Sequence, residues 1–299
     1  MKFPIKPTTI AEFKGTILGE KSVTVSYVSN LDNADRECLT FCDENHIAQI
    51  PQVKAGIILC PADAMNTIGD FEAASIVFTE NPILAFVKHL NRSGYNNKPE
   101  GNSASAFSTD ARSILEPVYI ESNVIVGKNF ELFPFTSIFS GTRIGNNCRI
   151  QSGSSIGAVG LAYAKEDETY CRIPHLGGVI IADDVDIGAN VTIVKGILQN
   201  TIIGKGTKIG NHVNIGHNVI IGKNCFISSG AVIAGSVVIE DECWIAPNVS
   251  ILNSVKIRQG DQIGIGSVVF KSTKGNFVYM GNPAKPVWKR KNRQLGDSQ

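Results

Sequence analysis

The sequence predicts a mainly β fold, in which a parallel β-helix of hexapeptide repeats lies between a small N-terminal α/β domain and a short C-terminal tail. Three observations support this prediction. In the second half of the chain an aliphatic residue recurs every six positions, a small or β-branched residue stands two positions before it, and glycine often follows it. A period of six matches neither a helix of about 3.6 residues per turn nor simple strand alternation. Each unit is therefore expected to be a short strand followed by a bend.

Residues 1–93 show no six-residue period and are expected to form the small α/β domain. Strand-like runs (TVSYVS, GIILC, ASIVFT) occur there with one helix-like stretch, NPILAFVKHLNR. A polar stretch rich in glycine, asparagine and serine follows, and it predicts a linker over residues 94–116.

The β-helix is expected over residues 117–270. The longest unbroken run of the period goes from Ile197 to Val269, and shorter runs span Ile120 to Ile156 and Ile181 to Ile193. The period lapses at 157–178, which predicts a projecting loop of the kind that often lines binding sites. Residues 271–299 are expected to form the tail, which contains a basic cluster.

Composition restricts the class of protein. The 28 basic and 27 acidic residues leave a formal charge of +1, so no broad field indicates a nucleic-acid partner. No apolar run reaches the roughly 18 residues that span a bilayer, and the N-terminus lacks the apolar core of a signal peptide, so we expect a cytoplasmic protein.

The seven cysteines are odd in number and lack CxxC spacing, which argues against a disulfide framework and a zinc ribbon. Cys148, Cys225 and Cys243 stand at the small interior position of the repeat, where a structural role is expected. We expect no metal site.

Several segments together resemble the UDP-3-O-acyl-glucosamine N-acyltransferases of lipid A and lipopolysaccharide synthesis, within the left-handed β-helix acyltransferases. They are LTF at 39–41, NPILAF at 81–86, IPHLGGVIIADDVDIGAN at 173–190, IIGKGTKIGNHVNIGHNVIIG at 202–222 and IAGS at 233–236. The resemblance implies a left-handed coil, a homotrimer with active sites between neighbouring prisms, and an N-terminal domain that binds the nucleotide-linked substrate.

The resemblance also implies the site residues. His217 matches the catalytic histidine, which would accept a proton as a sugar amine attacks a thioester. The oxyanion donor would be a backbone amide one coil further on, and 18 residues after His217 stands Gly235. Phe41 is expected to stack on a nucleobase, and His175, in the loop block, to contact substrate.

The chain also departs from the family pattern. Seven positions before His217, where the family has an acidic residue, this chain has Gly210, and Val194 replaces the acid of an IDRG-like segment. Glu44 and Ile47 stand where asparagine and tyrosine are usual, and the C-terminal helices of the family are nearly absent. We expect Asn211 and Asn218 to replace the lost acid in holding substrate or His217.

These departures favour an N-acyltransferase that acts on the amine of a nucleotide-linked amino sugar destined for a surface polysaccharide. A small acyl group would come from acyl-CoA as cosubstrate, with no permanently bound cofactor. GNPAK at 281–285 resembles a tail motif of coenzyme A-dependent sugar acetyltransferases, which makes Lys285 a candidate donor-binding residue.

Three alternatives remain open. One is the lipid A reaction itself, with acyl carrier protein as donor, and another is a non-catalytic trimeric binding scaffold. The third is a metal-dependent hydratase, which needs three converging histidines, whereas this stretch supplies only His212 and His217.

Overall fold

The computed structural model describes residues 1–95 and 113–289, which divide into two compact units. The first contains the N-terminal residues together with Leu161–Leu176 and Ile197–Gln199, and the second contains the β-helix. Most of the expected linker, and residues 290–299 of the expected tail, lie outside the described residues. Among the described residues, no helix combines the length and apolar character needed to cross a bilayer.

The first unit is an α/β domain built on a six-stranded sheet in the order β1-β3-β4-β5-β6-β2. Strands β3 to β6 run parallel, and β1 and β2 close the two edges in the antiparallel sense. The strands are β1 (Phe3–Thr9), β2 (Thr16–Gly19), β3 (Thr24–Val28), β4 (Cys38–Phe41), β5 (Ile57–Pro61) and β6 (Ser75–Thr79). Short 3-10 helices occupy Ile10–Glu12, Leu31–Asn33, Ile47–Gln52 and Ala62–Asn66.

Helix α1 (Pro82–Arg92) covers one face of this sheet and forms where the sequence predicts a helix. Asn81 caps its N-terminus by accepting a hydrogen bond from the Leu84 amide at 2.9 Å, and proline occupies the first turn. Phe86 and Leu90 are buried against the sheet because they lie on one stripe of the helix.

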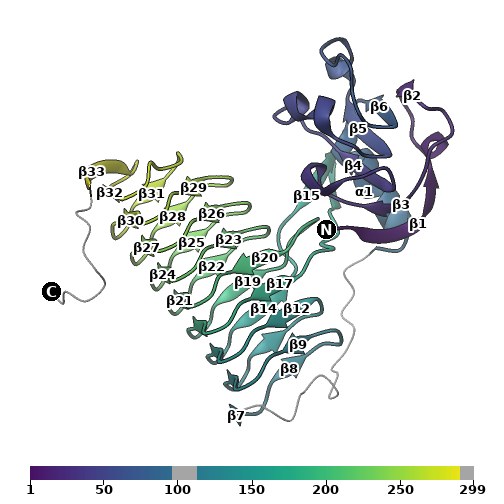
Figure 1. Cartoon of the computed structure of the whole chain (residues 1–299). Helices are drawn as coiled ribbons and strands as arrows, with labels where there is room; N and C mark the ends of the chain where they lie inside the picture. The colour runs from purple at the N-terminus through teal and green to yellow at the C-terminus, as the bar shows by residue number, and fades with distance from the viewer. Residues whose placement is uncertain (96–112, 290–299) are drawn as a thin grey trace. The chain divides into compact units, whose positions relative to one another are not determined.

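The second unit is a parallel β-helix whose strands stack into three sheets, here named I, II and III (Figure 1). Sheet I consists of β7 (Ser113–Ile114), β10 (Glu131–Leu132), β13 (Arg149–Ile150), β18 (Asp186–Ile187), β21 (Lys208–Ile209), β24 (Phe226–Ile227), β27 (Trp244–Ile245), β30 (Gln262–Ile263), β32 (Phe277–Met280) and β33 (Lys285–Lys289). Sheet II consists of β8 (Tyr119–Ile120), β11 (Ser137–Ile138), β14 (Ser155–Ala158), β19 (Thr192–Val194), β22 (Asn214–Ile215), β25 (Val232–Ile233), β28 (Ser250–Ile251) and β31 (Val268–Val269). Sheet III consists of β9 (Ile125–Val126), β12 (Thr142–Ile144), β17 (Val179–Ile181), β20 (Thr201–Ile203), β23 (Ile220–Ile221), β26 (Val238–Ile239) and β29 (Lys256–Ile257).

The six-residue period gives each strand one outward and one inward side chain. In β24, Phe226 is 56% exposed, whereas Ile227 is 1% exposed. Stacking in register, for example Ile209 beside Ile227, makes one continuous aliphatic core. The predicted β-helix is therefore confirmed; its left-handed sense stays a prediction.

The cysteines at the small interior positions are buried in this core. Burial raises the pKa of the Cys148 thiol to about 11. Such a thiol is not ionised at neutral pH, which fits the structural role expected for it.

The segment expected as a projecting loop contains an antiparallel hairpin that belongs to the first unit. Its strands are β15 (Tyr163–Glu166) and β16 (Thr169–Arg172). Polar contacts join it to α1 and its cap, among them an ion pair between Glu166 and Lys88 and hydrogen bonds from Asn81 Nδ2 to Lys165 O and from Asn91 Nδ2 to Arg172 O.

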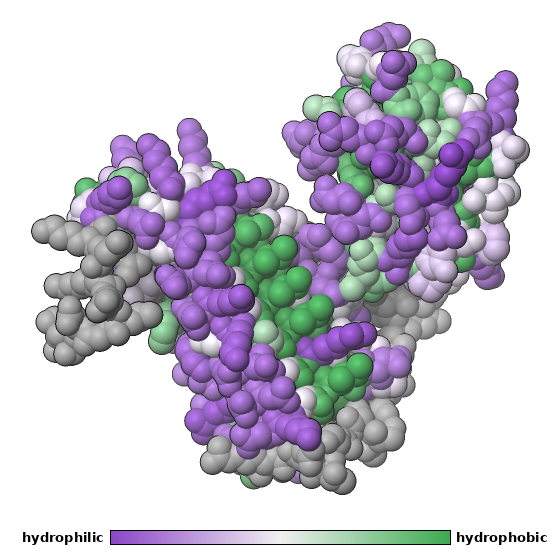
Figure 2. All heavy atoms as spheres, viewed as in Figure 1, coloured by the Kyte–Doolittle hydropathy of each residue, from purple (hydrophilic) through white to green (hydrophobic). Residues whose placement is uncertain are grey.

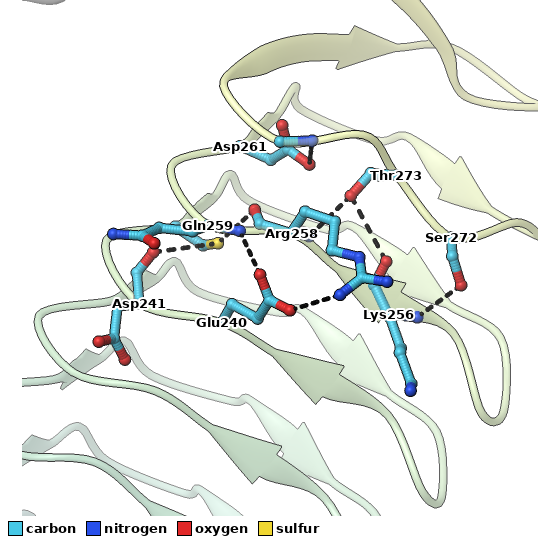
Figure 3. A network of polar contacts seen from close by, with 10 residues as sticks. Glu240, Asp241, Lys256, Arg258, Gln259, Asp261, Ser272 and Thr273 are labelled. Atoms are coloured by element: carbon cyan, nitrogen blue, oxygen red, sulfur yellow. Dashed lines mark hydrogen bonds and ion pairs between the residues drawn. The ribbon is translucent and has the colours of Figure 1, made fainter.

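The C-terminal end of the β-helix is closed by a second hairpin, β32–β33, within the range expected as a tail. Buried Asp261 anchors it by accepting hydrogen bonds from the amides of Phe277 at 2.8 Å and Gly275 at 3.3 Å. Tyr279 continues the interior column. One coil below Asp261, Glu240 accepts hydrogen bonds from the Arg258 side chain and the Gln259 amide (Figure 3).

Candidate functional site

His217 lies at the corner between sheets II and III, after β22 and before β23. Strands β22 and β25 pair in register, Asn214 beside Val232 and Ile215 beside Ile233. The same register places Gly235 one coil above His217 at the same corner. A hydrogen bond of 2.8 Å from the Ser236 amide to His217 O joins the two coils there.

The imidazole of His217 lies directly against Gly235. A methyl group added at Gly235 would be 2.6 Å from Cε1 and 2.7 Å from Nε2 of the ring, closer than real Cβ contacts. The absence of a side chain at position 235 is therefore what allows the histidine to adopt this position.

At the corner between sheets III and I, three coils have an acceptor side chain at the position equivalent to Gly235. There, Asn146, Asp183 and Asp241 occupy the equivalent position of their coils, and the Oδ1 atom of each accepts the backbone amide one coil below at 2.7–2.8 Å. Gly235 has no such acceptor. Within residues 1–95 and 113–289 the Gly235 amide itself donates no hydrogen bond, although its carbonyl accepts one from Ser254 at 3.1 Å.

The environment of His217 favours a neutral imidazole. Burial lowers its pKa from the usual value because the charged form loses hydration, and a hydrogen bond with the Asn218 side chain partly opposes that shift. No carboxylate contributes to the shift. The ring is therefore an unprotonated base at neutral pH.

Asn218 and Thr201 hold the backbone of this corner. Asn218 adopts a left-handed φ of 61°, which asparagine tolerates better than most residues. Its amide donates to Thr201 Oγ1 at 3.0 Å, and that hydroxyl donates to Val194 O at 2.7 Å. Sequence reasoning missed Thr201, since the only available signal was a threonine at a small interior position of the repeat.

Lys195 occupies the equivalent position one coil below His217, because Ile193 pairs with Ile215. Its ammonium donates to Ser140 O at 2.9 Å. The Lys195 ammonium therefore lies at this corner, and in sequence it directly follows Val194, which replaces the acid of the IDRG-like segment.

The other expected site residues are not at this corner. Asn211 lies at the corner between sheets I and II, where its Oδ1 accepts the Ala189 amide at 2.8 Å. Lys285 begins β33 and is exposed. Their roles as ligands stay predictions.

Phe41 and His175 both belong to the first unit. Phe41 ends β4 and is half-buried, with its ring 5.0 Å from that of Phe86. His175 is only 2% exposed, and its Nδ1 lies 3.1 Å from Ile173 O. Contacts within the first unit therefore account for the positions of both side chains, and their role in binding substrate stays a prediction.

A pocket of about 310 Å³ in the first unit lies where the parallel strands β4, β5 and β6 end, the usual ligand position of open α/β sheets. Asp43, Glu44, Glu80 and Asn81 are among its lining residues. Three carboxyl groups make this pocket acidic.

The described residues contain no group of three or more His, Cys, Asp and Glu side chains placed to hold a metal ion. The II/III corner brings together the imidazole of His217, the backbone of Gly235, the Asn218 and Thr201 side chains and, one coil below, the Lys195 ammonium.

The repeat defines the fold class of the protein. Residues 200–235 match the bacterial transferase hexapeptide family of six repeats, and residues 117–158 and 218–253 match the hexapeptide repeat of succinyl-transferase. The chain is a hexapeptide-repeat β-helix protein.

Within that class, the chain is similar to proteins named UDP-3-O-acylglucosamine N-acyltransferase, which confirms the resemblance expected from the sequence. It is 30% identical to the protein of Methylobacillus flagellatus over 233 residues, 68% of this chain and 65% of that one. It is 38% identical to that of Polynucleobacter asymbioticus over 105 residues, 34% of this chain and 30% of that one. The match thus spans less than two thirds of these relatives.

Solved structures agree on the fold. The UDP-N-acetylglucosamine acyltransferase of Francisella novicida has a TM-score of 0.55 and 25% identity, covering 62% of this chain and 68% of that one. The enzyme of the same name from Campylobacter jejuni has a TM-score of 0.52 and 22% identity, covering 61% and 74%.

Proposed function

We propose that this protein is an N-acyltransferase that moves an acyl group from a thioester to the amine of a nucleotide-linked amino sugar. One observation carries the proposal: the neutral imidazole of His217 lies on the bare backbone of Gly235, one coil above. This arrangement places a base beside an amide that donates no hydrogen bond to the described residues.

In the proposed reaction the sugar amine attacks the thioester carbonyl carbon, and His217 accepts the proton that the amine loses. The Gly235 amide donates a hydrogen bond to the oxyanion of the tetrahedral intermediate. The C–S bond then breaks, and the leaving thiolate takes the proton from the imidazolium. An amide and a free thiol result, and the imidazole returns to its neutral form.

Acyl-CoA is the proposed donor, with Lys285 as its contact. The alternative donor is acyl carrier protein in the lipid A reaction, and the names of the sequence relatives favour an acceptor of the UDP-acylglucosamine type. Phe41, His175, Asn211 and Asn218 remain proposed substrate contacts. The expected cytoplasmic location likewise stays a prediction.

We also propose that the protein acts as a homotrimer. The outward row of sheet III offers a surface for a second copy. In this row Ile180 pairs with Ile202, Ile202 with Ile220 and Ile220 with Val238, so four aliphatic side chains lie beside one another on successive coils. Figure 2 shows apolar side chains gathered along this side of the β-helix. The outward row of sheet II, by contrast, contains Ser137, Ser155, Thr192 and Asn214.

The proposal is tested by incubating the protein with a UDP-linked amino sugar and a panel of thioesters. The panel contains short and long acyl-CoA and long-chain acyl carrier protein, and mass spectrometry follows amide formation. We expect product with a short acyl-CoA. Product with acyl carrier protein alone would favour the lipid A reaction instead. Failure of every donor would favour the non-catalytic scaffold.

A further inference from the structure

Three successive coils of the β-helix place Lys195, His217 and Gly235 in one column at the II/III corner. Strand β19 pairs in register with β22, and β22 pairs in register with β25. Neighbouring coils lie about 4.8 Å apart, so the three residues stand above one another. The Gly235 amide, the proposed oxyanion donor, lies at the upper end of this column, and Lys195 lies at its lower end.

The Lys195 side chain runs down the corner, away from Gly235. Its ammonium donates to Ser140 O at 2.9 Å, and Ser140 lies at the same corner two coils below. The coil that the lysine stem crosses has Gly157 and Ala158 at its corner, and Ala158 O accepts the Lys195 amide at 3.0 Å. Because these two residues are small, they leave room for the stem along the corner. The part of the corner below His217 therefore combines two small residues with one cation.

The carboxylate of Glu121 lies at the same corner but faces protein groups. The residue is only 5% exposed. One of its carboxylate oxygens accepts the Ser140 amide at 2.9 Å, and the other accepts the Tyr119 hydroxyl at 3.2 Å. Lys195, by contrast, is half-buried, so part of its side chain faces solvent. An anion that approaches from solvent can therefore contact the Lys195 ammonium, whereas the carboxylate stays covered.

The proposed reaction determines which end of the column the acceptor occupies. The thioester carbonyl oxygen must lie at the Gly235 amide, above His217, if that amide is to stabilise the oxyanion. The sugar amine must lie within hydrogen-bond reach of the imidazole. Because the donor occupies the upper side, the sugar is left with the lower side, toward Lys195. In a UDP-linked 2-amino sugar the phosphate is on the carbon next to the amine-bearing carbon, so the diphosphate lies close to the base.

We propose that the Lys195 ammonium binds the diphosphate of the acceptor and so orients the sugar amine toward His217. This inference rests on the proposed function, which supplies a nucleotide-linked amino sugar. A lysine ammonium is a compact point charge that binds phosphate oxygens through charge-assisted hydrogen bonds. The assignment concerns the diphosphate alone and leaves the proposed stacking of the base on Phe41 unchanged.

Isothermal titration calorimetry with UDP and with a UDP-linked amino sugar tests this proposal. Lys195→Gln keeps a donor for Ser140 O and removes the charge, so it should raise both dissociation constants about tenfold. Lys195→Arg keeps the charge and should retain most of the affinity. Added salt should weaken UDP binding more in the wild type than in Lys195→Gln, because salt screens the attraction between ammonium and phosphate.

Lys208→Gln is the matched control. The Lys208 ammonium also donates to a backbone carbonyl, Asp184 O at 2.8 Å, but it belongs to sheet I. This variant should bind UDP as the wild type does. The melting temperature of each variant checks that folding is retained.

Unchanged UDP affinity in Lys195→Gln would overturn the inference, and so would an equal loss of affinity in Lys208→Gln. A lower kcat with unchanged UDP affinity would also overturn it, because the ammonium would then act on the chemical step. The transfer assay separates this result from the proposed function. If the wild type forms amide product and Lys195→Gln has an unchanged KM for the nucleotide sugar, only the role of Lys195 is wrong. If the wild type binds UDP through Lys195 but no thioester gives product, the proposed function is wrong.

Discussion

Gly235 determines where the imidazole of His217 lies, because a side chain at position 235 would occupy the volume of the ring. At the III/I corner, Asn146, Asp183 and Asp241 occupy the equivalent position and each accepts an amide of the coil below. Other coils have lysine or glutamine at this position. Gly235 has no acceptor side chain, and the imidazole of His217 lies against its backbone instead.

Gly235→Ala should therefore reduce acyl transfer strongly. The added methyl group would displace the ring, and misplacing a reacting group by about 1 Å can reduce the rate about 100-fold. The measurement is kcat/KM for the variant beside Gly69→Ala, where an added methyl group meets no atom within 4 Å. Equal rates for the two variants would contradict the role of Gly235.

The pH profile tests the environment of His217. Because burial lowers its pKa, the neutral base should persist below the usual value of about 6.5, and the acidic limb of kcat/KM should lie below that pH. Asn218→Ala removes the hydrogen bond that raises this pKa, so the limb should move to lower pH. A limb that stays in place or moves to higher pH would exclude this role of Asn218.

At the residue scale, the family resemblance singled out His217 and a backbone amide one coil further on, and the coil length of 18 residues then placed that amide at Gly235. The sequence was not enough to find Thr201, whose hydroxyl links Asn218 to Val194 across coils. The chemistry of a buried threonine depends on which backbone groups the neighbouring coil presents, and the repeat pattern does not specify these.

At the scale of the elements, the two residues of one short strand have opposite roles. Ile227→Ala should lower the free energy of unfolding by about 2–5 kcal/mol, because it removes fully buried methyl groups from a stacked core. Phe226→Ala in the same strand removes a larger but exposed side chain and should cost much less. Denaturant unfolding of the two variants measures the difference. A greater loss for Phe226→Ala would contradict the assigned register.

The β-helix was predictable because its period is local, whereas the two hairpins were not. The β15–β16 hairpin depends on contacts with α1, which is about 80 residues away in sequence. The β32–β33 hairpin depends on Asp261, whose carboxylate accepts the amides of Gly275 and Phe277. Neither tertiary contact leaves a periodic signal.

At the scale of the whole molecule, the apolar row of sheet III leads to the proposed homotrimer. Ile202→Asp places a charge in the middle of this row and should dissociate the trimer, because a buried unpaired carboxylate is costly at an interface. Light scattering coupled to gel filtration measures the mass. Gln262→Asp, on the outward row of sheet I, is the matched control and should leave the mass unchanged. A wild-type protein of monomer mass would contradict the proposal.

The central claim is that the His217–Gly235 corner performs acyl transfer, and a single-turnover rate with a UDP-linked amino sugar and an acyl thioester tests it most directly. His217→Ala should bind the nucleotide sugar normally and transfer acyl groups about 10²–10⁴ times more slowly than wild type, the usual contribution of a general base. His212→Ala, at the neighbouring corner, should retain the wild-type rate. A wild-type rate in His217→Ala would contradict the account.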